Sequence, residues 1–268
     1  MMRLRLFSTR GFQQAQAVLL RGGVLAGLLA VWALFSWGNQ TWEFVNPVLI
    51  PTPLEVARSG YELARQGLLQ QHWRISLWRV AEGFGLAAAA ALILGMLAGV
   101  SKFARFLVEP IVEFLRPIPP LAFLPMFLVW FGLGEASKVA FIAYTTFFPM
   151  FVTIAVGVMQ VDIILLRAAA SLGATRWQVL SYVVLPSALS GILVGLRVGF
   201  SLAIFVLVGA EFMGADRGLG YMIIEGRDFF MPAQIVLGAL VLGLLGFVVN
   251  SLLLWVERRL LRRRAALS

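Results

Sequence analysis

Long apolar runs alternate with shorter polar segments along the whole chain. The runs cover 22–42, 83–101, 118–131, 139–161, 187–212 and 232–256. About 20 apolar residues in a helix cross the hydrocarbon core of a bilayer, and most of these runs are long enough to do so. The pattern predicts an all-α, polytopic membrane protein with six transmembrane helices, the third of which is interrupted by prolines.

The polar segments divide the chain. We expect an N-terminal segment at 1–21, a first span with an external amphipathic segment at 22–82, a core at 83–256 and a basic tail at 257–268. Helical spacing of the charges in 43–82 favours helices that lie on the membrane surface. Lys and Arg are more numerous in the termini and the inner loops than in the opposite loops, so the positive-inside rule places both termini in the cytoplasm.

Composition excludes several kinds of chemistry. Hydrophobic residues make up 60% of the 268 residues, and the mean hydropathy of +0.90 is far above that of a soluble domain. The chain has no Cys, a single histidine (His72, interpreted as structural) and no Gly-rich phosphate loop, so we expect no enzyme activity, no metal and no cofactor of its own. The net charge of +9 is interpreted as a topology signal and not as a nucleic-acid footprint.

The segment 162–186, between the fourth and fifth runs, is longer than a simple connection requires. Asp162 is a favourable N-cap for a helix of small residues, which Gly173 would end in a left-handed conformation. Thr175 and Gln178 fit a capping box that starts a second helix. Such a hairpin is either a docking element for another protein or a turn packed on its own bundle, and its length favours docking.

This segment resembles the coupling motif of permease subunits in ATP-binding cassette importers. Ala168-Ala169, Gly173 and Leu185-Pro186 occur at the spacing of that motif, whereas Arg167 replaces its glutamate and Val183 its isoleucine. The stretches "EPIVEFLRPIPPLAFLPMFLVWFGLGEASK" and "GAEFMGADRGLGYMI" are similar to permeases of the taurine, alkanesulfonate and nitrate group. The resemblance covers about 47–256 and implies the type I importer permease fold.

The resemblance also implies partners and a coupling surface. A second copy of the chain, two cytoplasmic ATPase subunits that bind ATP and Mg, and a periplasmic or lipoprotein substrate-binding protein would complete an importer in the cell inner membrane. The residues implied to contact the ATPase are Arg167, Ala168, Ala169, Ser171, Leu172, Gly173, Ala174, Arg176, Leu185 and Pro186.

Four residues are candidates for the translocation pathway, because polar groups within membrane spans are often functional. Glu211 would shape the outer gate or reach the membrane surface, and Arg197 would attract an anion or pair with an acid of another helix. Phe127 and Trp130 would line the pathway or serve in packing. We expect neutral substitutions of Glu211 or Arg197 to affect transport more than folding.

Other polar residues and the cargo leave alternatives open. Glu109, Glu113 and Arg116 share one helix face and would form an ion-pair network within the helix or between subunits. The resemblance favours taurine or another alkanesulfonate as cargo, with nitrate, bicarbonate or a thiamine precursor as alternatives. An ion-coupled secondary transporter and a membrane scaffold are the rival classes of function.

Overall fold

The computed structural model describes residues 6–265, and the side chains of residues 22–259, as an all-helical protein. The predicted segments at the two ends, 1–21 and 257–268, therefore lie partly outside the described residues. The helices are α1 (Leu6–Trp42), α2 (Pro53–Arg65), α3 (Leu68–Val100), α4 (Lys102–Leu115), α5 (Pro120–Phe131), α6 (Glu135–Met159), α7 (Ile163–Ser171), α8 (Arg176–Gln178), α9 (Leu185–Phe212), α10 (Leu219–Asp228) and α11 (Pro232–Ala265). A 3-10 turn, Pro47–Leu49, precedes α2, and a π-helical segment, Val179–Val184, joins α8 to α9.

Five of the described helical segments are long and apolar enough to cross a membrane. They lie in α1, α3, α6, α8–α9 and α11. A sixth span is possible if α4 and α5 are taken together, because this pair meets the same criteria but bends by 100° at the break. The predicted multi-span helical protein is therefore confirmed, with the proline-rich third element as the broken one.

Helices α3, α6 and α9 form the centre of the bundle, and α6 lies between the other two. Helices α6 and α9 approach each other closely at a pair of glycines, Gly157 and Gly191. A Cβ atom built on Gly157 would lie 2.9 Å from the Cα atom of Gly191, so the two backbones are in direct contact there. Small residues allow this close approach. In a membrane the hydrophobic effect does not drive helices together, and close van der Waals packing of this kind stabilises their contact instead.

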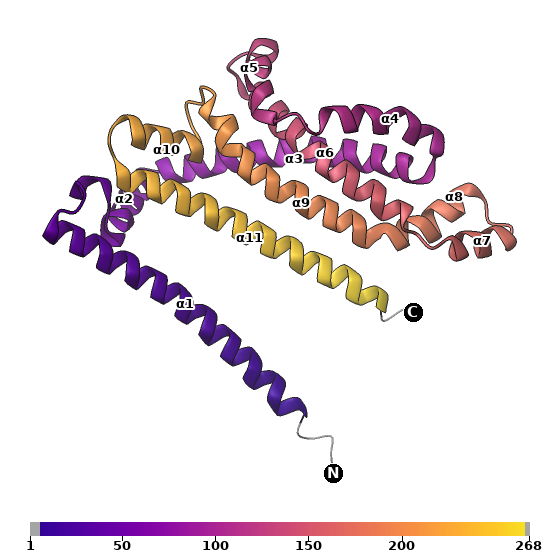
Figure 1. Cartoon of the computed structure of the whole chain (residues 1–268), viewed down its shortest axis with the longest axis horizontal. Helices are drawn as coiled ribbons and strands as arrows, with labels where there is room; N and C mark the ends of the chain where they lie inside the picture. The colour runs from indigo at the N-terminus through magenta and orange to yellow at the C-terminus, as the bar shows by residue number, and fades with distance from the viewer. Residues whose placement is uncertain (1–5, 266–268) are drawn as a thin grey trace.

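The hairpin of α7 and α8 protrudes at one end of the molecule, beyond the ends of α6 and α9 (Figure 1). Helices α2 and α10 lie at the opposite end, and α11 returns from there towards the hairpin end (Figure 1). Helix α1 is separated from the bundle except near α2, where the indole Nε1 of Trp32 donates a hydrogen bond to the carbonyl oxygen of Pro51 at 3.1 Å. Helices α1 and α11 both run lengthwise between the α2–α10 end and the two described ends of the chain (Figure 1).

One expected helix boundary is wrong, and the third run is shorter than a membrane span. The helix that contains the second span begins at Leu68 and not at Gly83, so the expected division at 82/83 falls inside α3. Only α2 remains as a separate amphipathic helix of the 43–82 segment. The third run contributes only the 12 residues of α5, whose length of about 18 Å is too short to cross a bilayer without α4.

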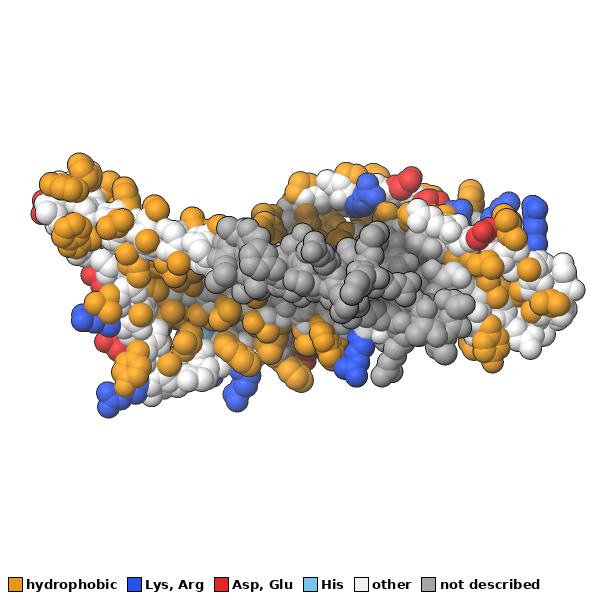
Figure 2. Space-filling view, turned by 90° about the horizontal axis from the view of Figure 1, so that it is seen from below, with side chains coloured by type: hydrophobic (Ala, Val, Ile, Leu, Met, Phe, Trp, Pro, Cys, Tyr) orange, Lys and Arg blue, Asp and Glu red, His pale blue; other side chains and the backbone are white. Residues whose placement is uncertain are grey.

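Helix α4 presents large apolar side chains to the surroundings, and Phe103, Phe106 and Phe114 are all more than 70% exposed. Figure 2 shows many hydrophobic side chains on the lower face of the molecule, with Lys and Arg side chains mostly near its edges. Among the residues whose side chains are described, Glu109, Glu113 and Arg116 form no ion pair with one another. The intra-helical network expected for them is therefore wrong, and pairing between subunits stays a prediction.

Candidate functional sites: a helical hairpin and a buried polar cluster

The hairpin between α6 and α9 is held by local hydrogen bonds at both helix ends. The carboxylate of Asp162 accepts a hydrogen bond from the amide of Ile164 at 2.8 Å and so caps α7. The predicted capping box is present, because the Thr175 hydroxyl accepts from the Gln178 amide and the Gln178 side chain accepts from the Thr175 amide. Both caps were predicted from the sequence and are confirmed.

Gly173 ends α7 in the left-handed conformation that the sequence predicts, with φ of +75°. The amide of Gly173 donates to the carbonyl of Ala170, and the amide of Ala174 donates to the carbonyl of Ala169. This pair of bonds is a Schellman motif, which satisfies the last carbonyls of the helix. No atom lies within 4 Å of the position that a Cβ atom on Gly173 would take, so the turn faces open space.

The outer surface of the hairpin carries large apolar side chains that none of the described residues covers. Leu172, Trp177 and Tyr182 are 87%, 74% and 78% exposed. A cluster of exposed apolar residues on a protruding element is typical of an interaction surface. The ten residues implied to couple to an ATPase all lie on α7, the turn, α8 and the first residues of α9.

A π-helical segment, Val179–Val184, connects the hairpin to α9 and lies directly before Leu185-Pro186. Proline has no amide hydrogen and its ring displaces the carbonyl four residues before it, so the α-helical pattern cannot continue unchanged through this position. The π turn thus joins the hairpin to a membrane span without a flexible loop.

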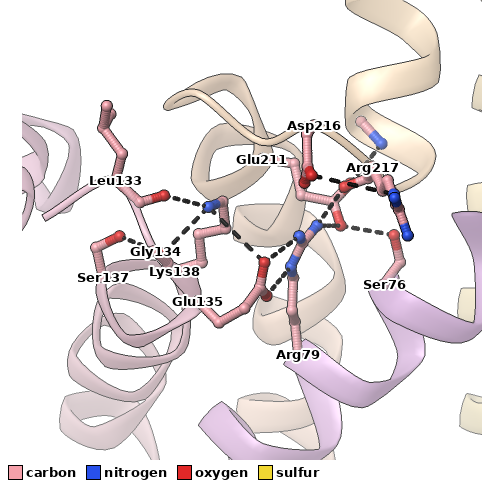
Figure 3. Close-up of polar contacts among 12 residues, drawn as sticks. Ser76, Arg79, Leu133, Gly134, Glu135, Ser137, Lys138, Glu211, Asp216 and Arg217 are labelled. Atoms are coloured by element: carbon pink, nitrogen blue, oxygen red, sulfur yellow. Dashed lines mark hydrogen bonds and ion pairs between the residues drawn. The ribbon is translucent and has the colours of Figure 1, made fainter.

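The second site is a cluster of buried charges at the opposite end of the bundle (Figure 3). Arg79 of α3 has a side chain that is only 1% exposed, and it contacts two carboxylates from two other helices. Its Nη2 atom lies 2.6 Å from Glu135 of α6, and its Nη1 atom lies 2.8 Å from Glu211 of α9. Nη1 also donates to the carbonyl of Arg217 at 2.6 Å, so one guanidinium connects three helices and a loop.

Glu211 is fully satisfied inside this cluster. Its Oε1 atom accepts from the Ser76 hydroxyl at 2.6 Å, and its Oε2 atom accepts from the Gly220 amide at 2.6 Å. The side chain is completely buried, so the interpretation that Glu211 reaches the membrane surface is wrong. Its contacts join α9 to α3 and to the start of α10, and a role of Glu211 in an outer gate stays a prediction.

Sequence reasoning did not identify Ser76 or Arg79; of the two interpretations of His72, structural or on the surface, the structure supports the structural one. The Nδ1 atom of His72 accepts a hydrogen bond from the amide of Gly218 at 3.0 Å. A signal was present, because positions 72, 76 and 79 are spaced by four and three residues and share one helix face. The three polar side chains on that face all contact the 211–220 segment.

The remaining candidates for the pathway do not join either site. Arg197 pairs with Glu257 of α11 at 3.1 Å, which realises the predicted pairing with an acid of another helix. Phe127 is 6% exposed and packs against Phe141 and Tyr144, whereas Trp130 is 59% exposed. A part in translocation stays a prediction for these residues. No group of three or more potential metal ligands occurs among the described residues.

Comparison with known proteins gives these two sites a family context. Residues 91–264 match the family model described as the binding-protein-dependent transport system inner membrane component. The chain is 37% identical over 251 residues to the taurine transport system permease protein TauC of Escherichia coli (strain K12), covering 92% of this chain and 90% of that protein. It is 36% identical over 239 residues to the putative aliphatic sulfonates transport permease protein SsuC of Bacillus subtilis (strain 168), covering 89% and 85%.

A solved structure shows the same fold. A chain of an amino acid ABC transporter superposes with a TM-score of 0.59 and 22% sequence identity, covering 74% of this chain and 97% of that one. The fold is therefore that of a type I importer permease, as the resemblance implied. The matches over most of the chain show that this protein belongs to the family of inner membrane components of binding-protein-dependent transport systems.

Proposed function

We propose that this chain is the membrane-spanning subunit of an ATP-driven importer for a small organic sulfonate, either taurine or an aliphatic sulfonate. The observation that carries the proposal is the capped α7–α8 hairpin, which protrudes from the bundle with Leu172 and Trp177 exposed near its turn. Similarity to permeases named for taurine and for aliphatic sulfonates supports the substrate class.

In this proposal the chain performs no chemistry. Two copies form the translocation pathway, and a separate ATPase subunit binds ATP and Mg against each hairpin. A substrate-binding protein delivers cargo at the end that carries α2 and α10. Closure of the ATPases moves the hairpins and switches the spans between two conformations. The ATPases can drive this switch only if their contacts with the hairpins differ between the two conformations.

Transport with the complete system tests this function. The chain is co-expressed with its ATPase and its binding protein, and uptake of radiolabelled taurine and propanesulfonate is measured. We expect at least one sulfonate to accumulate and the ATPase to co-purify with the chain. An ATPase variant without its catalytic base is the control and should abolish uptake. Uptake that persists with this control would indicate an ion-coupled transporter, and absence of sulfonate uptake would refute the substrate class.

In the proposed orientation the protein lies in the cell inner membrane, with the hairpin and both termini in the cytoplasm. Because the chain has no Cys, single cysteines report the side of the membrane without background. We expect Asp216→Cys to react with an impermeant thiol reagent from outside and Gln178→Cys to react only after the membrane is opened. Both positions are exposed in the chain, and labelling of the permease expressed without the ATPase keeps Gln178 uncovered, so burial does not explain a difference. The reverse pattern of labelling would overturn the orientation.

A further inference from the structure

A groove of about 810 Å³ lies between the break of α4–α5 and the facing sides of α6 and α9. Most of the side chains that line it are apolar, among them Phe148, Leu202 and Phe205. Only Arg116, Tyr144 and Thr145 contribute polar groups, and none of the described residues that line it is an acid. The groove thus combines a large apolar surface with one positive charge.

Arg116 lies at the break itself, directly after the last residue of α4. It is exposed, and its guanidinium forms no ion pair with the carboxylates whose side chains the structure describes. An uncompensated guanidinium at a helix break beside an apolar groove favours an anionic ligand, because broken helices in transporters place polar groups where cargo passes.

Tyr144 supplies a second polar group without a partner. Its hydroxyl is buried and forms no hydrogen bond among the described residues. Phe123 and Phe148 hold the ring by edge-to-face contacts with centroids 5.3 and 5.0 Å away. A buried hydroxyl without a partner is unfavourable, so a ligand oxygen that reached it would restore a lost hydrogen bond. Thr145 cannot donate to a ligand in the same way, because its hydroxyl already donates to the carbonyl of Phe141 at 2.8 Å.

We propose that this groove is a binding subsite for an aliphatic sulfonate, and that it discriminates against taurine. The sulfonate oxygens accept hydrogen bonds from Arg116 and, after a small shift of the ring, from Tyr144, while the alkyl chain contacts Phe148 and Phe205. This inference rests on the proposed function, since it names which member of the sulfonate class the permease itself prefers.

The discrimination follows from charge. Taurine carries an ammonium group where propanesulfonate, a molecule of the same shape, carries a methyl group. The ammonium would lose water on entering the groove without meeting a carboxylate among the described residues that line it, which is costly. The methyl group gains by the same transfer. The two molecules have the same shape, so a difference in their affinities would measure how strongly the apolar lining disfavours the ammonium group.

Ligand binding to the permease–ATPase complex in lipid nanodiscs tests the subsite without the preference of the binding protein. The melting temperature of the complex is measured against increasing propanesulfonate or taurine. We expect the half-maximal concentration for propanesulfonate to be about tenfold below that for taurine. This ratio corresponds to the cost of partly desolvating the ammonium group of taurine. Equal concentrations for the two ligands, or no saturable shift with propanesulfonate, would overturn the proposal.

Variants locate the binding. Arg116→Gln should raise the half-maximal propanesulfonate concentration about tenfold, the usual effect of a lost charged hydrogen bond, and Arg116→Lys should raise it less. Lys102→Gln removes an exposed cation at the start of the same helix, outside the groove, and should change nothing. Tyr144→Phe should weaken propanesulfonate binding while leaving the melting temperature of the unliganded complex the same or higher, because it removes an unpartnered hydroxyl.

An unchanged affinity in Arg116→Gln would place the ligand elsewhere. The complete importer separates this failure from that of the proposed function. Sulfonate uptake with no binding in the nanodisc complex would refute only the subsite, whereas absence of uptake of either sulfonate would refute the function on which the subsite depends.

Discussion

Replacement of Arg79 by methionine is expected to destabilise the folded permease by about 3–5 kcal/mol, the usual cost of removing one partner of a buried ion pair. The carboxylate of Glu211 is fully buried, so it would lose the guanidinium without gaining access to water. The three helices and the loop that Arg79 connects would also lose their common contact. The measurement is the free energy of unfolding in detergent, followed by helical circular dichroism.

Arg197→Met is the matched control, because it removes the same side chain from another ion pair between helices. Arg197 and Glu257 are 32% and 17% exposed, so their pair is partly solvated and its loss should cost about 0–1 kcal/mol. A second change, Glu211→Gln, should recover much of the stability lost in Arg79→Met, since no buried charge would then lack a partner and the amide oxygen can still accept a hydrogen bond from the Gly220 amide. Equal losses for Arg79→Met and Arg197→Met would show that the cluster is not an important source of stability.

Gly173→Val is expected to reduce uptake by at least about tenfold while the bundle itself stays folded. A β-branched residue in the left-handed conformation costs more than about 1–2 kcal/mol, and its side chain would project into the open space beside the turn. Strain and bulk would both act at the surface proposed to contact the ATPase. The measurements are uptake and the amount of ATPase that co-purifies, together with the melting temperature of the permease.

Gly67→Val provides a control for the backbone strain. Gly67 has φ of +77°, almost the same as Gly173, and a Cβ atom there also meets nothing within 4 Å. It lies between α2 and α3, at the end of the molecule opposite the hairpin. The two variants should lose similar stability, but only Gly173→Val should lose the bound ATPase. Normal uptake with bound ATPase in Gly173→Val would show that the hairpin is not the coupling element.

The hairpin could be predicted residue by residue because its hydrogen bonds are local. Asp162, Gly173 and the Thr175–Gln178 box each act within a few residues of their own position. The polar cluster was not predicted, because it depends on pairs such as Arg79 and Glu211, which lie 132 residues apart in the chain. No periodicity within one helix shows which carboxylate an arginine will meet.

The wrong start of the second span has the same cause. Arg74, Arg79 and Glu82 made the first half of α3 resemble a surface helix, since charges in a membrane span are costly. Arg79 is tolerated there because Glu135 and Glu211 neutralise it inside the protein. The bend between α4 and α5 was more accessible to prediction, since prolines at 117, 119 and 120 interrupt a helix directly. The angle of the bend was not, because it depends on the neighbours of both halves.

The contact of Gly157 with Gly191 has a mechanical consequence. It lies near the end of α6 and the start of α9, on either side of the hairpin, and the two backbones have no side chains between them to yield. Such a crossing acts as a fulcrum, with the hairpin as the short arm of a lever and the remainder of α6, about 33 Å to Glu135, as the long arm. A rotation of about 10° around this point would displace the outer end by about 6 Å for a rigid helix of that length. That end carries Glu135 and Glu211. A small movement of the hairpin would therefore cause its largest displacement at the contacts that Arg79 makes with these two carboxylates.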